Sequence, residues 1–244
     1  MAKRPTPRLS KARAIELADS MLPHIQREVY WGLEIEVAME AANDVVQGGY
    51  RGKTFYGANT FNVVVNALAI ELSLVLAKLF EIPSPRPGRS AADRFNRSDI
   101  ASIPLLVRLL RQKQCCTHYV SLSMDWEFGI GKAMNGEAPV VARTAERLIS
   151  RYGSARRSPK YQVAMKRIRD FRNIRVAHSL MIQPTMPIYK DLHMLMDLAR
   201  ETLQDMRLVM KGEAVDLLEK ESIRRREAAH FWAAALPAAI VADK

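Results

Sequence analysis

Cysteine is almost missing from this chain of 244 residues, and its two copies, Cys115 and Cys116, are neighbours. Adjacent cysteines seldom form a bridge, so the sequence excludes a disulfide framework and favours a reducing, cytoplasmic compartment. The first residues, Met1 to Arg8, are basic and broken by proline, and no apolar stretch follows them. We therefore expect no secretory signal.

The sequence also has no long apolar run free of polar residues. Its longest candidate, from Phe61 to Phe80, contains Asn62, Asn66, Glu71 and Lys78. A membrane-spanning helix would accommodate these residues poorly, whereas the central helix of a bundle would accept them. We therefore expect a soluble core helix and no membrane partner.

Acidic residues are too few to balance the basic ones. The chain has 26 Asp and Glu against 37 Lys and Arg, which gives a formal net charge of +11. Such an excess favours a polyanionic partner, and nucleic acid before a membrane. With 48% hydrophobic and 26% charged residues, the composition is that of a soluble globular protein and excludes a disordered one.

The apolar spacing predicts helices nearly everywhere. Ile25, Val29, Leu33 and Val37 recur one helical turn apart, and Gly48-Gly49 follows them. The expected helices cover about 23–47, 59–81, 98–110, 138–150, 159–181 and 188–210, after a first segment that Ser10 caps. Residues 119–124 fit either a helix or a strand. We predict one all-α domain over 1–244, with a core of about 23–212 and a helical extension over 213–244.

Two helix boundaries have strong signals. Ser158-Pro159 places an N-cap before a proline at the first helical position, and this arrangement starts helices efficiently. Gly212 follows a long apolar stripe and is expected to end the helix that carries it.

The helix predicted after Ser158 lies in the most basic part of the chain. It includes or adjoins Arg156, Arg157, Lys160, Lys166, Arg167, Arg169, Arg172 and Arg175, and only Asp170 opposes them. His178 follows three residues after Arg175. A histidine can transfer a proton near neutral pH, and an arginine can hold phosphate oxygens. Together they are sufficient to cleave a phosphodiester without a metal.

A helical projection places His178 within an apolar arc. That arc comprises Val163, Ala164, Phe171, Ile174, Ala177, Met181 and Ile182. Arg172 lies about 120° around the helix and roughly 9 Å along its axis from His178, and Arg175 lies between them. These three side chains can border one groove, although a lone histidine on an apolar face is more often a hydrogen-bonded core residue. The residues alone therefore leave a purely structural role open.

The stretch from Lys166 to Ser179 resembles the signature of HEPN domains (higher eukaryotes and prokaryotes nucleotide-binding). Arg172, Asn173 and His178 match its Arg-x5-His pattern, with a polar residue after the arginine. The ending Ala177-His178-Ser179 is similar to that of the AbiU-like abortive-infection branch. Residues 72–81 and 103–110 are also similar to that branch, and the resemblance spans roughly 25–210.

This resemblance implies a bundle of long antiparallel helices that pairs as a homodimer and brings two motifs into one cleft. It implies a metal-independent endoribonuclease without a cofactor, acting as a toxin or antiphage effector, with a cognate antitoxin as a further partner. Arg172 would orient and neutralise the scissile phosphate, His178 would transfer a proton, and Asn173 would hold the geometry. The RNA 2′-hydroxyl would attack and leave a cyclic phosphate.

RNA would also need contacts along its backbone. Lys166, Arg167, Arg169 and Arg175 are the expected backbone-binding residues, and they would not read sequence. We expect no metal ligands. Two other functions stay open: a non-catalytic protein that holds RNA, a nucleotide or a partner protein, and an adaptor whose apolar tail, 231–241, docks a partner or a membrane.

Other possible sites are weaker. Residues 48–54 end like a phosphate-binding loop, but the glycine spacing is one residue short and no strand precedes it, so we expect a turn. Cys115, Cys116 and His118 do not match a common zinc spacing and are interpreted as buried thiols beside an incidental histidine. The remaining histidines, which stand alone in the sequence and receive no role, are His24, His193 and His230.

Overall fold

The structure is a computed structural model that describes residues 9–50, 55, 57–82, 99–126, 139–177 and 187–236. Over these ranges it contains eight α-helices, one short 3₁₀ helix (η2) and no strand, so the all-α prediction is confirmed. The elements are α1 (Lys11–Gly49), α2 (Ala58–Leu79), α3 (Ile103–Leu110), α4 (Lys113–Leu122), η2 (Ser123–Asp125), α5 (Val140–Arg157), α6 (Pro159–Ala177), α7 (Tyr189–Lys211) and α8 (Leu217–Ala235).

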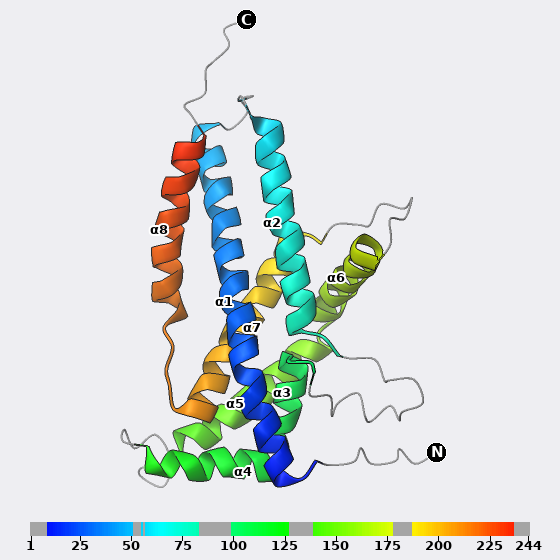
Figure 1. Ribbon diagram of the computed structural model, residues 1–244, viewed down its shortest axis with the longest axis vertical. Helices are drawn as coiled ribbons and strands as arrows, with labels where there is room; N and C mark the ends of the chain where they lie inside the picture. The colour runs from blue at the N-terminus through cyan, green and yellow to red at the C-terminus, as the bar shows by residue number, and fades with distance from the viewer. Residues whose placement is uncertain are drawn as a thin grey trace, which may run out of the picture.

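The long helix α1 is the axis of the fold. It runs along the longest dimension of the molecule with α2 and α8 beside its upper half (Figure 1). α7 crosses behind α1, and α3, α4 and α5 pack around the lower end of the molecule. α6 leaves this base and rises beside α2, so the basic helix lies at the edge of the bundle.

One continuous helix replaces the two segments expected before Gly48. Ser10 caps it as predicted, since its Oγ accepts from the Arg13 N–H at 3.3 Å, but α1 then runs through Pro23 to Gly49. A new helix was expected from about residue 23, where the apolar spacing begins, but proline is tolerated here within a continuous helix. The helix continues because Met21, Leu22 and Ile25 on either side of the proline are buried in the core.

Two further boundaries differ from the sequence prediction, and one open assignment is resolved. α3 begins at Ile103, not near residue 98, because Ser102 is extended and donates its hydroxyl to the Glu81 carbonyl at 2.8 Å. The ambiguous segment 119–124 is helical, since it belongs to α4 and η2. α5 continues to Arg157, beyond the expected end at residue 150.

The boundaries with strong signals are confirmed. Ser158 Oγ accepts from the Tyr161 N–H at 3.2 Å, and α6 starts at Pro159. Gly212 adopts the left-handed conformation (φ 69°) directly after α7, and its N–H donates to the Leu208 carbonyl at 3.1 Å.

Gly212 gives a stability prediction with a matched control. Gly212→Ala should destabilise the protein by about 2–4 kcal/mol, because a Cβ would lie 2.5 Å from Trp126 Cε3 and the positive φ disfavours a side chain. Gly153→Ala, inside α5, should stabilise it by about 0.5–1 kcal/mol, since its Cβ would have only Arg157 Nη1 nearby, at 3.8 Å. Urea unfolding of both variants measures the difference. Equal effects of the two substitutions would contradict this packing.

By length and composition α2 is apolar enough to cross a membrane. The core helix of a soluble protein passes the same test, and α2 buries Phe61, Val65, Ala69, Leu72 and Leu76 inside the bundle. Hydropathy alone therefore does not place this helix in a lipid bilayer.

Candidate functional site

Helix α6 presents one buried face. Tyr161, Ala164, Met165, Ile168 and Phe171 are buried, with the spacing of a single helical stripe. The predicted apolar arc included Val163 and omitted Met165 and Ile168. Val163 is 47% exposed, whereas Met165 and Ile168 are buried, so this part of the prediction is wrong. The buried face is therefore rotated around the helix axis, relative to the predicted arc, toward Ile168. The arginines lie at the borders of this face or in solvent.

The two residues that directly follow α2, Phe80 and Glu81, contact α6. The Phe80 ring is fully buried and packs edge-on against Tyr161, with ring centroids 5.9 Å apart. Next to it, Glu81 Oε1 lies 3.7 Å from Arg172 Nη1. These contacts fix both ends of α6 relative to the end of α2.

Arg172 and Asn173 form a small polar unit near the end of α6. The Arg172 Nε and Nη2 groups both donate to Asn173 Oδ1, at 3.4 and 3.3 Å. The Arg172 side chain is 36% exposed, so its guanidinium is positioned by Asn173 and Glu81 and is still accessible to a ligand. His178 comes one residue after the end of α6 and lies outside the described residues, as does the Arg175 side chain.

The predicted RNA-binding residues differ in their surroundings. Arg167 Nη1 lies 2.7 Å from Asp191 Oδ2 and thereby joins α6 to α7. Lys166 Nζ lies 2.7 Å from Asp170 Oδ2, one turn along α6. Arg169 is exposed, and within the described ranges no carboxylate pairs with it. Of these three cations, Arg169 is the most available for a phosphate.

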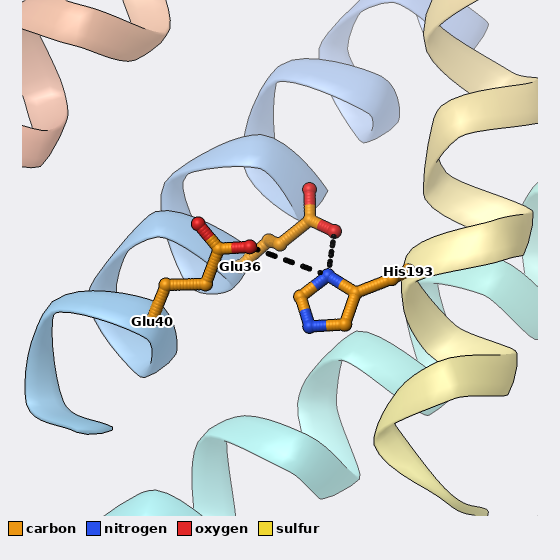
Figure 2. A group of neighbouring side chains, drawn as sticks. All are labelled: Glu36, Glu40 and His193. Atoms are coloured by element: carbon orange, nitrogen blue, oxygen red, sulfur yellow. Dashed lines mark hydrogen bonds and ion pairs between the residues drawn. The ribbon is translucent and has the colours of Figure 1, made fainter. Parts of the chain in front are cut away.

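A second polar cluster was not predicted, and it lies between α1 and α7. His193 Nδ1 is 2.6 Å from Glu36 Oε1 and 3.4 Å from Glu40 Oε1 (Figure 2). Glu36 and Glu40 are one turn apart on α1, so both carboxylates reach the same ring. His193, which appeared isolated in the sequence, is therefore paired across 157 residues.

Burial and charge shift the titration of this cluster. Glu36 is only 2% exposed, and its burial raises the pKa of its carboxyl group. The hydrogen bond to Glu36 is the main cause that raises the pKa of His193. Arg200 Nη2 lies 3.3 Å from Glu36 Oε2, and Arg225 Nη2 pairs with Glu40 Oε2. Each carboxylate thus has one oxygen held by an arginine and the other directed at His193.

His193 also borders a surface groove. The groove has a volume of about 590 Å³ and lies along α7 beside α5 and α6. Arg151, Tyr161, Lys190, His193 and Leu198 are among its lining residues. The His193 side chain is 36% exposed, so the ring is partly open to solvent.

The two cysteines are free, and α4 carries both. Cys115 is buried, and burial raises the pKa of its thiol to about 12. Burial also raises the pKa of Cys116. His118 packs against the Tyr119 ring at 5.2 Å, and the three residues 115, 116 and 118 do not gather as a metal-binding group in the described structure.

These shifts predict unreactive thiols. At pH 8, native Cys115 should react with a disulfide reagent much more slowly than a free cysteine, because burial keeps its thiol protonated and shields it. Denaturation should expose both thiols and restore ordinary rates, as thiol titration with and without denaturant measures. Fast labelling of two thiols in the native protein would contradict the burial.

The remaining candidates have simpler roles. Gly48 and Gly49 end α1, and residues 51–54 of the possible phosphate loop lie outside the described ranges. In the tail, Trp232 is buried and donates its Nε1–H to the Ala38 carbonyl at 2.9 Å, whereas Phe231 is 63% exposed. The tail therefore packs on the bundle through α8, and residues 237–241 are not described.

Comparison with known proteins gives no relative: no family model, curated protein or solved structure matches the chain. The described residues form an all-α bundle.

Proposed function

We propose that this protein is a metal-independent endoribonuclease of HEPN type that acts as a homodimer in a prokaryotic cytoplasm, as a toxin or antiphage effector. The observation that carries the proposal is the Arg172–Asn173 unit near the end of a basic helix. Its guanidinium is fixed by two hydrogen bonds to Asn173 Oδ1 and stays accessible. His178 follows within six residues, so the two groups needed for phosphate binding and proton transfer lie close in the chain.

The chemistry follows from these groups. The RNA 2′-oxygen attacks the adjacent phosphorus, the bond from phosphorus to the 5′-oxygen breaks, and a 2′,3′-cyclic phosphate remains. His178 acts either as the general base that accepts the proton of the 2′-hydroxyl or as the general acid that protonates the leaving 5′-oxygen. The other proton is exchanged with solvent or with the second protomer's histidine. Arg172 neutralises the charge that develops on the phosphate oxygens. Asn173 keeps the guanidinium in one orientation, and therefore reduces the cost of ordering a long side chain.

Backbone binding extends from the same helix. Arg169 binds a neighbouring phosphate directly. Lys166 and Arg167 contact RNA phosphates either in place of Asp170 and Asp191 or while still paired with them. Arg175, three residues after Arg172 in the sequence, is proposed as a further backbone-binding residue. A second protomer would bring a second set of these cations to one cleft.

The test is cleavage of single-stranded RNA by the purified protein in excess chelator. The proposal predicts chelator-resistant cutting and a dimer in light scattering. Salt-sensitive RNA binding without cutting would favour a non-catalytic RNA-binding protein that uses the same exposed cations. Absence of both cutting and RNA binding would contradict both functions.

A further inference from the structure

We infer that Glu36, Glu40 and His193 form a binding site for a divalent transition-metal ion that links α1 to α7. The inference concerns a different cluster from the Arg172 motif and does not rest on the proposed nuclease activity. One imidazole nitrogen and two carboxylate oxygens are ligands that Zn²⁺, Mn²⁺ and Fe²⁺ use in proteins. The three ligand atoms all lie within 4.8 Å of one another.

Two of the three separations between ligand atoms fit a single ion after a small side-chain movement, and the third, between the two carboxylate oxygens, is at most 4.8 Å. Ligand atoms about 2.1 Å from a tetrahedral metal are separated by about 3.4 Å. Glu40 Oε1 and His193 Nδ1 are already 3.4 Å apart, and the 2.6 Å between Glu36 Oε1 and His193 Nδ1 has to widen by less than an ångström. The side chains approach this point from two helices (Figure 2).

The surrounding arginines orient the ligands. Arg200 contacts Glu36 Oε2 at 3.3 Å, and Arg225 contacts Glu40 Oε2. Both carboxylates are thereby turned so that Oε1 is directed at the imidazole. Groups that hold the second oxygen of a ligating carboxylate commonly support metal sites and strengthen binding.

The local charge is negative despite these arginines. Arg200 contacts Glu36, Asp197 and Glu221, and Arg225 contacts Glu40, Asp44 and Glu221. Five carboxyl groups therefore face two guanidinium groups, so acidic side chains outnumber the arginines around His193. A divalent cation at the Oε1 position offsets part of this excess and displaces the proton that His193 Nδ1 shares with the carboxylates.

Access and open coordination positions complete the site. The His193 side chain is 36% exposed and the Glu40 side chain 28%, so two of the three ligand groups are open to solvent. Three protein ligands leave at least one position for water or another small ligand. Because α1 and α7 belong to the same core, a bound ion should stabilise the folded bundle.

The test is a titration of the full-length protein with Co²⁺, followed by its visible absorption, with Zn²⁺ competition. We expect one equivalent to bind the unmodified protein, and affinity to fall at least tenfold in His193→Gln and Glu40→Gln. His230→Gln is the matched control, because His230 is an exposed histidine on α8, and it should bind as the unmodified protein does. Equal Co²⁺ affinity in His193→Gln and the unmodified protein would overturn the inference.

Thermal unfolding is a second measurement, and it separates loss of the metal site from loss of folding. Glu40 is 28% exposed and Glu36 only 2%, so Glu40→Gln is the substitution that the fold tolerates better. Zn²⁺ should raise the Tm of the unmodified protein but not of Glu40→Gln, and Mg²⁺, which prefers an all-oxygen octahedron, should raise neither. Identical Tm shifts with Zn²⁺ in both proteins would overturn the site. Neither readout involves RNA cleavage, so failure here is distinct from failure of the nuclease proposal.

Discussion

Arg172→Ala and His178→Ala are each expected to lower the rate of RNA cleavage in chelator by about 10² to 10⁴. The arginine would otherwise stabilise charge on the phosphate as the transition state forms, and the histidine would move the proton. The measurement is single-turnover cleavage of a labelled single-stranded RNA. Both groups serve one chemical step, so their effects should not add. The double variant should cleave only slightly more slowly than the slower of the two single variants.

Matched substitutions separate this loss from general damage. Arg13→Ala removes a surface arginine that pairs with Glu16 on α1, and His230→Ala removes an exposed histidine on α8; both should cleave at the full rate. His178→Ala should still bind RNA with nearly unchanged affinity and salt dependence, because backbone cations supply the binding. Full activity of either motif variant would show that the motif is not the catalytic site.

Phe80→Ala should lower the free energy of unfolding by about 3–5 kcal/mol. The Phe80 ring is fully buried at the end of α2 and packs edge-on against Tyr161 of α6, so the substitution leaves a cavity and removes an aromatic pair. Guanidinium unfolding should show a lower midpoint with an unchanged slope. Because Phe80 supports α6, RNA cleavage should become heat-sensitive in parallel.

The control for Phe80→Ala is the same change at an exposed site. Phe231 is 63% exposed on α8 and contacts Trp232 at 5.2 Å, so Phe231→Ala should cost no more than about 1 kcal/mol. Similar losses at positions 80 and 231 would contradict the packing of α2 against α6.

Local signals in the sequence were sufficient for the fold class and for several boundaries. Ser10, Ser158-Pro159 and Gly212 act within one or two helical turns, and the structure confirms each of them. The expected helix start near residue 23 is wrong, because residues on both sides of Pro23 are buried in the core and one helix runs through it. Local propensity is a weak guide wherever tertiary packing opposes it.

The candidate sites were predictable to different degrees. The Arg172 motif is contiguous, so the sequence alone draws attention to it. The cluster joins His193 to Glu36, which lies 157 residues earlier in the chain, and to Glu40, and nothing near His193 in the sequence indicates these partners. A Glu-x3-Glu pair on an apolar helix was the available signal, because a carboxylate on a buried face has to find a partner.

The most direct test of the proposed nuclease uses the substrate itself. Two oligonucleotides of identical sequence, one of RNA and one with 2′-O-methyl groups throughout, are incubated with the protein and chelator, and the product ends are analysed. The proposal predicts that both oligonucleotides bind, that only the RNA is cut, and that its new ends carry 2′,3′-cyclic phosphate. Cutting of the methylated strand, or products that end in a free 3′-hydroxyl, would contradict attack by the 2′-oxygen.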